Sequence, residues 1–455
     1  MLHSHGKEHT SVFPSPLLRR LKNPFIAGTL ILTVTGLVSR LVGFFYRIFL
    51  SRMFGEENIG IYQLISPVMS LVFSFSTAGI QNAVSKFAAG KEASHDGRAG
   101  IRVLFTGLLF SLPSSLLCTS VIFCGADFIA ERLLFESRCA PLLRIAALSF
   151  PFSAVHSCIN GYFYGLRKAA VPASAQLMEQ FVRVGSVYLI SLAALQEGRE
   201  LSVSVAAAGL VIGEMASMLL TICAVRIHFS RHSISRHRRP SPHDPLSARK
   251  KQLFSLSGQM LSFSAPLCLN RLCINILQAI EAACIPAKLQ VYGYSVSESL
   301  SVYGVLTGMA LPLILFPGTL TNSVSNNHRM IGRTVMKCIL YCLLLGGICS
   351  FLFLCAGEMI GALLFDSRLA GQLIGMMGFL CPFLYLHTTL TSILHGLGKT
   401  GYTFGLSMSS LLLRLLFVFQ AIPVYGMKGY LIGMLLGQLL TTVFSLIPLK
   451  RYCMP

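Results

Sequence analysis

Long apolar runs recur along the whole chain, and polar residues gather between them. A helix rises about 1.5 Å per residue, so about 20 apolar residues cross the hydrocarbon layer of a bilayer. The runs are continuously apolar rather than alternating, which favours helices over a membrane barrel. The pattern predicts twelve spans, at 25–50, 59–85, 103–125, 141–165, 170–195, 201–225, 254–286, 299–325, 338–357, 370–395, 403–423 and 427–448.

Composition supports an all-α polytopic membrane protein. Charged residues make up 12% and hydrophobic residues 54% of the 455 residues, and the mean hydropathy is +0.68. An average soluble domain has about 25% charged residues. Most of the 14 cysteines fall inside the predicted spans, where a cysteine behaves as a small apolar side chain.

The net charge of +20 predicts an orientation in the membrane rather than a nucleic-acid partner. With both termini in the cytoplasm, roughly two thirds of the lysines and arginines fall on the cytoplasmic side, as the positive-inside rule requires. Most acidic residues fall on the outer side. We therefore expect a multi-pass protein of the cytoplasmic membrane whose basic loops contact anionic lipid heads, and no nucleic-acid partner.

The one long polar break divides the predicted spans into six and six. The segment Arg231–Lys251 is rich in Arg, Ser and Pro, as in a cytoplasmic linker. The expected organisation is a cytoplasmic tail at 1–24, a six-helix lobe at 25–228, a basic linker at 229–252, a second six-helix lobe at 253–449 and a cytoplasmic tail at 450–455.

The two halves resemble each other. "YGLRKA" at 164–169 matches "HGLGKT" at 395–400, and the same offset of 231 residues carries Arg183 onto Arg414. "IQNAVS" at 80–85 parallels "LTNSVS" at 320–325, with an offset of 240. Because six is even, both halves enter the membrane from the same side, which makes the repeat a parallel one. Such architectures place a substrate site between the lobes, so transport is the leading function class.

Arginines inside the spans mark the candidate site. One arginine at a helix centre costs about 2.5–3.5 kcal/mol on insertion scales, so these residues must face water, a partner or a carbonyl. Arg40 and Arg47 are seven residues apart and share one helix face, and Arg271, Asn275 and Gln278 form a similar stripe on the seventh span. The two stripes predict one basic cavity between the lobes. Guanidinium groups bind phosphate oxygens in a bidentate fork, so the cavity suits an anionic headgroup.

The acidic residues of the spans have two possible roles. Glu179 lies four residues before Arg183, so we expect a structural ion pair within one helix. Arg414 lacks such a partner in its own helix, because the equivalent position is Ser410. Glu214 and Glu281 either carry a coupling proton or sodium ion or pair with an arginine on another helix.

Enzyme, metal and cofactor motifs are absent from the sequence. It contains no nucleotide-binding Gly-x-x-x-x-Gly-Lys-Ser/Thr loop, no His-Glu-x-x-His and no Gly-x-Ser-x-Gly. His228 and His232 are four residues apart but have no acidic or cysteine partner nearby. We expect no enzyme activity, no metal and no cofactor.

The first two spans resemble a known family. The residues Ser39-Arg40-x-x-Gly43, "RMFG" at 52–55, Gly60-x-Tyr62-Gln63 and "AGIQNAVSK" at 78–86 are similar to the stage V sporulation protein B group of polysaccharide and lipid-linked oligosaccharide transporters. This group belongs to a superfamily with multidrug and toxin extrusion (MATE) transporters and the lipid II flippase MurJ. The resemblance implies two six-helix bundles around a V-shaped cavity, alternating access, and a polyprenyl-pyrophosphate-linked sugar as cargo. It also implies a link to spore cortex assembly and peptidoglycan precursors.

The same resemblance suggests roles for individual residues. Arg40 matches a cavity arginine of the flippase relatives, and Arg47 is one residue displaced from a second. The flippases also use arginines of helices two and eight, where this chain instead has Asn82 and Asn322. We expect Arg40→Ala to abolish function while the protein remains at normal levels in the membrane.

Three functions follow from these observations. The first is a flippase for an undecaprenyl-pyrophosphate-linked glycan such as a peptidoglycan or polysaccharide precursor. The second is a cation-coupled multidrug antiporter on the same scaffold, and the third is a non-transporting scaffold that recruits cell-wall synthesis enzymes. Arginines outnumber glutamates in the predicted spans, and this sign of charge favours the flippase.

Overall fold

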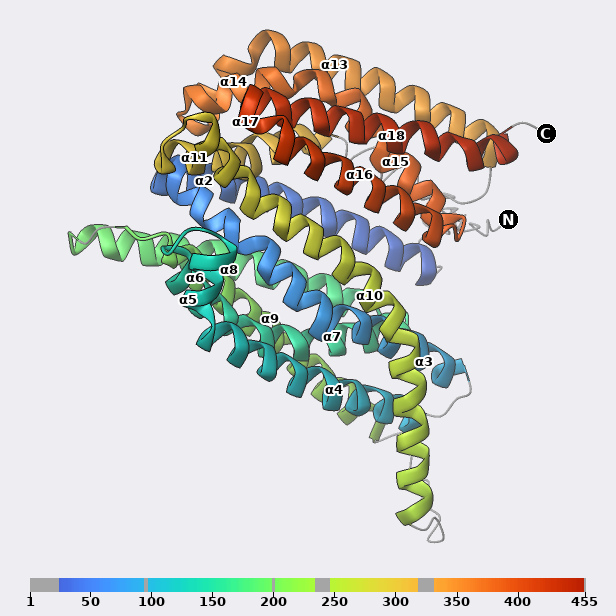
Figure 1. Cartoon of the computed structure of the whole chain (residues 1–455). Coiled ribbons are helices and arrows are strands. Elements are labelled where there is room, and N and C mark those ends of the chain that lie inside the picture. Colours follow the sequence, from blue (N-terminus) through green and yellow to red (C-terminus); the bar gives the residue numbers. More distant parts are fainter. Residues whose placement is uncertain (1–23, 94–96, 199–200, 234–245, 318–330, 454–455) are drawn as a thin grey trace, which may run out of the picture.

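The protein is helical in a computed structural model (Figure 1). The structure describes residues 24–93, 97–198, 201–233, 246–317 and 331–453. Within these residues there is no strand, and eleven helices are long and apolar enough to span a membrane. The main helices of the first half are α2 (Pro24–Phe73), α3 (Gly79–Ala93), α4 (Gly97–Cys124), α6 (Cys139–Ala147), α7 (Ser149–Gly165), α8 (Ala170–Gln196) and α9 (Ser204–Ser233). Those of the second half are α10 (Leu246–Tyr292), α11 (Val296–Gly304), α13 (Ile331–Phe365), α14 (Arg368–Met377), α15 (Cys381–Gly396), α16 (Thr400–Gln420) and α18 (Met427–Cys453). Shorter elements join them: η1 (Ser74–Ala78), α5 (Ala126–Phe128), η2 (Ile129–Leu133), η3 (Val305–Ala310), η4 (Gly378–Leu380) and α17 (Ile422–Tyr425).

The predicted all-helical membrane fold is confirmed, with one difference in the number of helices. The first two predicted spans form a single helical run, Gly28–Gly90, which bends at Gly55. Gly55 has φ +76°, a conformation that side chains with a Cβ rarely adopt. The bend allows the two spans to turn back without an intervening loop, so twelve apolar runs give eleven helices.

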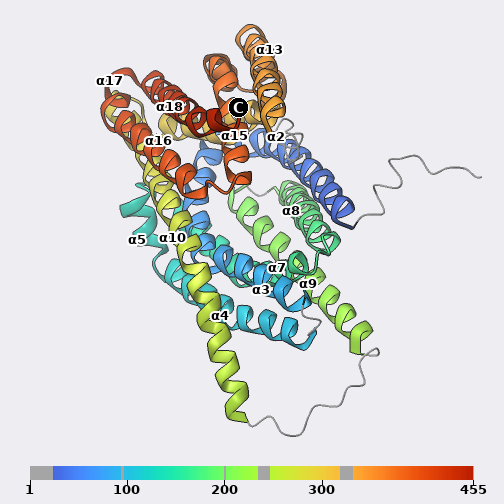
Figure 2. The ribbon, with the colours of Figure 1, turned by 90° about the vertical axis from the view of Figure 1, so that its right-hand side faces the viewer.

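The helices form two groups with α2 and α10 between them (Figures 1 and 2). In the first group α7 packs on α3, α4 and α9, and α8 packs on α9. In the second group α13 packs on α14 and α15, and α18 packs on α15 and α16. We call these the N-terminal and C-terminal helix groups.

Helix α10 contacts both groups. Its Met260 is buried with Ala83 and Val84 of α3, and the ring of its Phe263 lies edge-on to Phe87. Farther along, α10 packs on α16 and α17 of the C-terminal group. Both views show it running from the C-terminal helices to the side of α4 (Figures 1 and 2).

The two groups are joined at the end of the molecule that lies away from the chain termini (Figure 1). Glu57 accepts hydrogen bonds from Arg138 at 2.7 Å and from Ser297 at 2.6 Å. Arg52 donates to the main-chain oxygen of Leu364 at 3.0 Å. Hydrogen bonds to Glu136, and then to Glu57, raise the pKa of the Arg138 guanidinium, which therefore stays charged. We call this the closed end.

A close backbone contact also joins α2 and α11 near the closed end. A Cβ on Gly60 would lie 2.1 Å from the main-chain oxygen of Leu300, and one on Gly304 would lie 2.5 Å from the Gly60 nitrogen. Only glycine allows helices to approach so closely. Gly60 and Leu300 are 240 residues apart, which is the offset between the two halves in these spans, so equivalent positions contact each other. In Figure 1 the helix groups spread apart from this side toward the chain ends.

Candidate functional site: a basic pocket

A pocket of about 710 Å³ lies between α2, α10 and the helices α7, α8 and α9. Small-molecule sites in proteins commonly have volumes of about 300–1,000 Å³. Its polar and charged lining comes mainly from three places in the chain. These residues are Ser39, Tyr46, Arg47, Tyr62, Gln63, Ser66, Ser70 and Ser74; Ser149, Ser153, Gln180, Arg183 and Glu214; and Arg271 and Asn275.

Two arginines from different halves of the sequence reach this pocket. Arg47 is half-buried and donates to the main-chain oxygen of Thr307 at 3.3 Å. Thr307 lies in the π-helical turn η3, where the backbone ladder is displaced and carbonyl groups lose their usual partners. Arg271 of α10 also lines the pocket and is exposed. One arginine from each predicted stripe, Arg47 and Arg271, thus lines the same pocket.

Asn275 connects the helices around the pocket. Its side-chain nitrogen donates to the main-chain oxygen of Ser70 at 3.0 Å and to Ser74 Oγ at 2.7 Å. Ser74 begins another π-helical turn, η1, on the second span. Asn275 therefore holds α10 against α2 and leaves the charged contacts to Arg47 and Arg271.

Several polar atoms of the pocket lining are buried without a hydrogen-bond partner in the described protein. They are Ser39 Oγ, Tyr46 Oη, Ser153 Oγ and Arg183 Nε. Buried polar atoms nearly always have a partner, because an unmade hydrogen bond costs about 1–3 kcal/mol. All four belong to residues that line the same pocket, so a small shift of their side chains would let a polar ligand or water reach them there.

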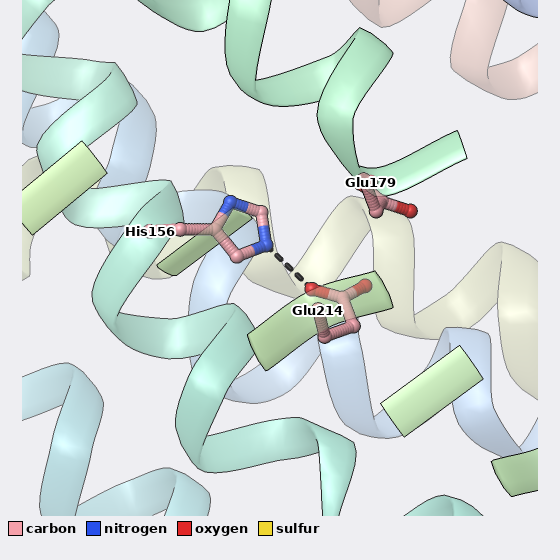
Figure 3. A group of neighbouring side chains, drawn as sticks. All are labelled: His156, Glu179 and Glu214. Atoms are coloured by element: carbon pink, nitrogen blue, oxygen red, sulfur yellow. Dashed lines mark hydrogen bonds and ion pairs between the residues drawn. The ribbon is translucent and has the colours of Figure 1, made fainter. Parts of the chain in front are cut away.

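A network of charged or titratable side chains reaches the pocket through Arg183 and Glu214. Figure 3 shows its other members, His156 and Glu179, together with Glu214. His156 Nε2 on α7 lies 2.6 Å from Glu214 Oε2 on α9, and Asn160 Nδ2 lies 3.3 Å from His156 Nδ1. Arg183 donates to Glu179 within α8, as an ion pair four residues apart. Ligand-type atoms of His156, Glu179 and Glu214 lie within 4.8 Å of one another, a spacing that would suit a metal ion. Arg183 and the histidine already bind these carboxylates, so the group is a hydrogen-bond network within the protein.

A second buried ion pair lies in the C-terminal helix group. Arg414 Nε of α16 donates to Glu281 Oε1 of α10 at 2.7 Å, and a second nitrogen donates to Oε2. Tyr430 of α18 donates to Glu281 Oε1 at 3.1 Å. Sequence spacing found no partner for Arg414 within its helix, and the structure supplies one from α10. Glu281 is 4% exposed and fully used by these bonds.

Other predicted cavity residues lie outside the pocket. Arg40, Asn82 and Gln278 are exposed and do not line it. Phe44, one turn beyond Arg40, packs on Phe316, so Arg40 lies on the helix face toward the C-terminal group. Asn322 lies outside the described residues.

Sequence reasoning missed His156 and several hydroxyl-bearing residues of the pocket. A histidine within an apolar span is itself a signal, because ionisable residues are costly there. Four residues that carry the family resemblance, Ser39, Gly43, Tyr62 and Gln63, also line the pocket. Those motifs therefore combine pocket residues with the structural residues Arg52, Gly55 and Gly60.

Comparisons with known proteins agree with this architecture. The chain is 27% identical over 446 residues to stage V sporulation protein B of Bacillus subtilis, covering 93% of this chain and 83% of that protein. It is 21% identical over 472 residues to the lipid II flippase MurJ of the same organism, covering 95% and 84%. Among solved structures, an inward-facing multidrug resistance MATE family transporter of the MOP superfamily matches with a TM-score of 0.67 and 14% identity, over 91% of this chain and 95% of that one.

These likenesses show a multi-pass membrane protein with the fold of MOP superfamily transporters. The model of the family described as "Polysaccharide biosynthesis protein" matches residues 25–290, more than half of the chain. The matched residues include α2, α7, α8, α9 and most of α10, which together line the pocket. The chain therefore belongs to the polysaccharide biosynthesis protein family.

Proposed function

We propose that the protein is a flippase that carries a lipid-linked glycan with a diphosphate link across the cytoplasmic membrane by alternating access. One observation carries the proposal: Arg47 and Arg271, from two halves of the sequence, line a single pocket among membrane-spanning helices. An arginine in a span is stable only where it meets water or an anionic partner, and a diphosphate is such a partner. The sequence relatives support the same cargo class, since one of them is named a lipid II flippase.

In this proposal the described conformation faces the cytoplasm. The basic segment Arg231–Lys251 and both termini lie on the cytoplasmic side by the positive-inside rule. The helix groups spread apart on the side where the chain ends lie, and they are joined at the opposite, closed end (Figure 1).

The pocket provides separate partners for the parts of the cargo. Arg47 and Arg271 bind the diphosphate oxygens, since guanidinium groups donate two parallel hydrogen bonds to such groups. The buried hydroxyls of Ser39, Tyr46 and Ser153 bind phosphate or sugar oxygens. The apolar chain of the lipid remains in the bilayer, where burial costs nothing. Arg40 lies two turns before Arg47 on α2, about 10 Å along the helix and farther from the closed end. An entering diphosphate meets Arg40 before it reaches the pocket.

A cation-coupled drug antiporter is the second candidate, because the fold likeness includes a multidrug transporter. Such a protein needs free acidic groups to attract a cationic drug. Here Glu179 is paired with Arg183 and Glu281 with Arg414, and Glu214 is bonded to His156. The acidic groups are used inside the protein, while Arg271 is exposed to the pocket, so the sign of the free charge favours an anion.

A reconstituted system separates these two functions. The full chain is placed in vesicles that contain a fluorescent lipid-linked oligosaccharide, and the fraction that reaches the outer leaflet is measured over time. The same vesicles are tested for efflux of a cationic dye under a proton or sodium gradient. Lipid movement without dye efflux supports the flippase. Dye efflux without lipid movement would overturn it.

A further inference from the structure

We propose that His156 and Glu214 form a proton-binding site in the N-terminal helix group, and that protonation of this site and diphosphate binding in the pocket favour each other. The second half of this proposal rests on the proposed function. Neither the family match nor the names of the relatives assign any role to these residues.

The geometry of the pair requires a proton. His156 Nε2 and Glu214 Oε2 are 2.6 Å apart, a distance at which one of the two atoms must donate a hydrogen to the other. The histidine is 8% exposed, and the neighbouring Asn160 contacts its other ring nitrogen. The imidazole is thus held in one orientation, with its Nε2 directed at the carboxylate (Figure 3).

The charges around the pair favour the binding of one more proton. Glu214 of α9 and Glu179 of α8 are the carboxylates that act on His156, and Arg183 is the cation that neutralises Glu179. With a neutral imidazole, two carboxylates oppose one guanidinium inside a membrane-spanning group. A second proton, on Nδ1 of the imidazole, gives an ion pair with Glu214 and makes the network neutral, which a low-dielectric interior favours. The Asn160 amide then turns its Oδ1, which is buried without a partner, toward the new N–H.

Other groups packed around the network do not supply this charge. Tyr62 and Tyr46 of α2 act electrostatically on Arg183, but a tyrosine is neutral at ordinary pH. Lys86 of α3 lies over the ring of Phe263, 3.8 Å from its centre. Arg47 donates to Thr307 and Arg271 is exposed to the pocket, so among the groups bonded within the network His156 is the one whose protonation brings it to neutrality.

The C-terminal helix group shows the opposite balance. Its buried pair has one carboxylate, Glu281, and one guanidinium, Arg414, so it is neutral without a proton. Arg183 and Arg414 occupy equivalent positions in the two halves. Among the described residues, a second carboxylate that is bonded to a histidine lies beside Arg183, whereas the histidine near Arg414, His387, has no such carboxylate partner. The asymmetry assigns proton binding to the N-terminal group.

The site also shares the pocket with the arginines. Glu214 and Arg183 line the same pocket as Arg47 and Arg271, so the charge on the network acts on any anion bound there. When the imidazole is neutral, it hydrogen-bonds Glu214 without cancelling its negative charge, which repels a diphosphate. When it is protonated, that charge is cancelled and the anion binds more tightly. By linkage, a bound diphosphate must raise the affinity for the proton by the same factor.

The test measures binding as a function of pH. The probe is a short-chain polyprenyl-diphosphate-linked N-acetylglucosamine, a diphosphate diester without the second ionisation near about pH 6 of a phosphate monoester. Its dissociation constant with the purified full-length protein is measured by calorimetry between about pH 5 and about pH 9, the range in which histidine titrates. Two buffers of different ionisation enthalpy give the number of protons taken up on binding.

The expected result is a dissociation constant that rises with pH, by up to about tenfold per pH unit above the midpoint of the site, which is the limit for one linked proton. His156→Gln and Glu214→Gln should both remove this dependence and the proton uptake. His228→Gln is the matched control, because it removes a histidine of α9 fourteen residues beyond Glu214, about 21 Å along the helix. This control should retain the full dependence on pH.

The outcomes distinguish the two proposals. Binding without proton uptake in the unchanged protein, or uptake that persists in both variants, would overturn the proton site while leaving the flippase intact. If diphosphate binding takes up no proton and instead depends on the concentration of Na⁺ or Zn²⁺, the group binds a metal ion, and the proton site is also overturned. If the probe does not bind at all, the proposed cargo is wrong. An infrared titration of the protein without ligand then tests the proton site on its own. A pH-dependent change in the carboxyl and imidazole infrared bands that is lost in Glu214→Gln supports the proton site. If the unchanged protein shows no such change, the proton site is rejected.

Discussion

Arg183 and Arg414 are 231 residues apart, at equivalent positions of the two halves, and glutamates from different places neutralise them. Arg183 pairs with Glu179 of its own helix, whereas Arg414 pairs with Glu281 of α10. The halves thus keep a buried guanidinium and differ in how they compensate it. The second arrangement ties α16 to α10, a helix that also contacts the N-terminal group, so it contributes to the joining of the two groups.

Breaking the buried pair of the C-terminal group should destabilise the protein strongly. Replacing Arg414 by Met leaves Glu281 buried without its charge partner, which costs about 3–5 kcal/mol. The double variant Arg414→Met, Glu281→Gln should recover much of this loss, because no charge is left. The midpoint of thermal unfolding in detergent measures both. The matched control is Arg144→Met, which breaks the exposed pair with Asp127 and should cost less than about 1 kcal/mol. Equal losses of stability in Arg414→Met and Arg144→Met would contradict the assignment of Arg414 and Glu281 as a buried ion pair.

The pocket arginines should determine the rate of lipid movement. Arg47→Ala and Arg271→Ala each remove hydrogen bonds to an ionised group, worth about 1.5–3 kcal/mol, so flipping in vesicles should fall roughly ten- to a hundredfold. Lysine at the same positions should restore only part of the rate, because it lacks the bidentate fork. Arg144→Ala again serves as the control and should leave the rate unchanged. Full activity of both pocket variants would remove the basis of the proposed function.

The glycine contact between α2 and α11 should not tolerate a methyl group. Gly60→Ala places a Cβ about 2.1 Å from a backbone oxygen that cannot move aside, so we expect a loss of about 1–3 kcal/mol in stability. Gly36→Ala on the same helix is the control, since its Cβ would meet no atom within 4 Å. A thiol-reactive dye can follow unfolding, because Cys139, Cys158 and Cys381 are buried and become accessible only when the fold opens. A stability of Gly60→Ala equal to that of Gly36→Ala would show that the contact is looser than described.

Linking the groups at the closed end should stop transport. Glu57 and Ser297 side chains are 2.6 Å apart, so cysteines at both positions can be joined by a short bifunctional methanethiosulfonate reagent, which attaches through two disulfides. The linked protein cannot open this end, and lipid flipping should cease until a reductant releases the link. Each single-cysteine variant treated with the same reagent controls for reaction at the 14 native cysteines. Undiminished flipping in the linked protein would argue against alternating access.

The helical framework could be predicted from the sequence because each spanning helix must itself be apolar, whatever its neighbours are. A span must be apolar over its whole length, and this is visible without knowledge of its neighbours. The division between the first two spans was less visible. Gly55 turns the chain inside a continuous helix, so the polar residues after it do not form a separate loop.

The site could be predicted only in part, because its interactions cross between helices. Helical spacing alone identified the pair Glu179 and Arg183, and the stripe that brings Arg271 and Asn275 to the pocket. It could not show that Arg414 meets Glu281, which lies 133 residues earlier, or that His156 meets Glu214, 58 residues away. Packing, rather than periodicity, determines these pairs.

Helix α10 contains a hinge between the two helix groups. Its first part is buried against α3 and its later part against α16, and Pro266 lies between the two attachments. Proline removes one bond of the helical ladder, so this turn resists bending less than any neighbouring turn with a complete ladder. Rocking of one helix group against the other would therefore flex the chain at Pro266, and a stiffer residue there would slow the whole cycle without touching the cargo.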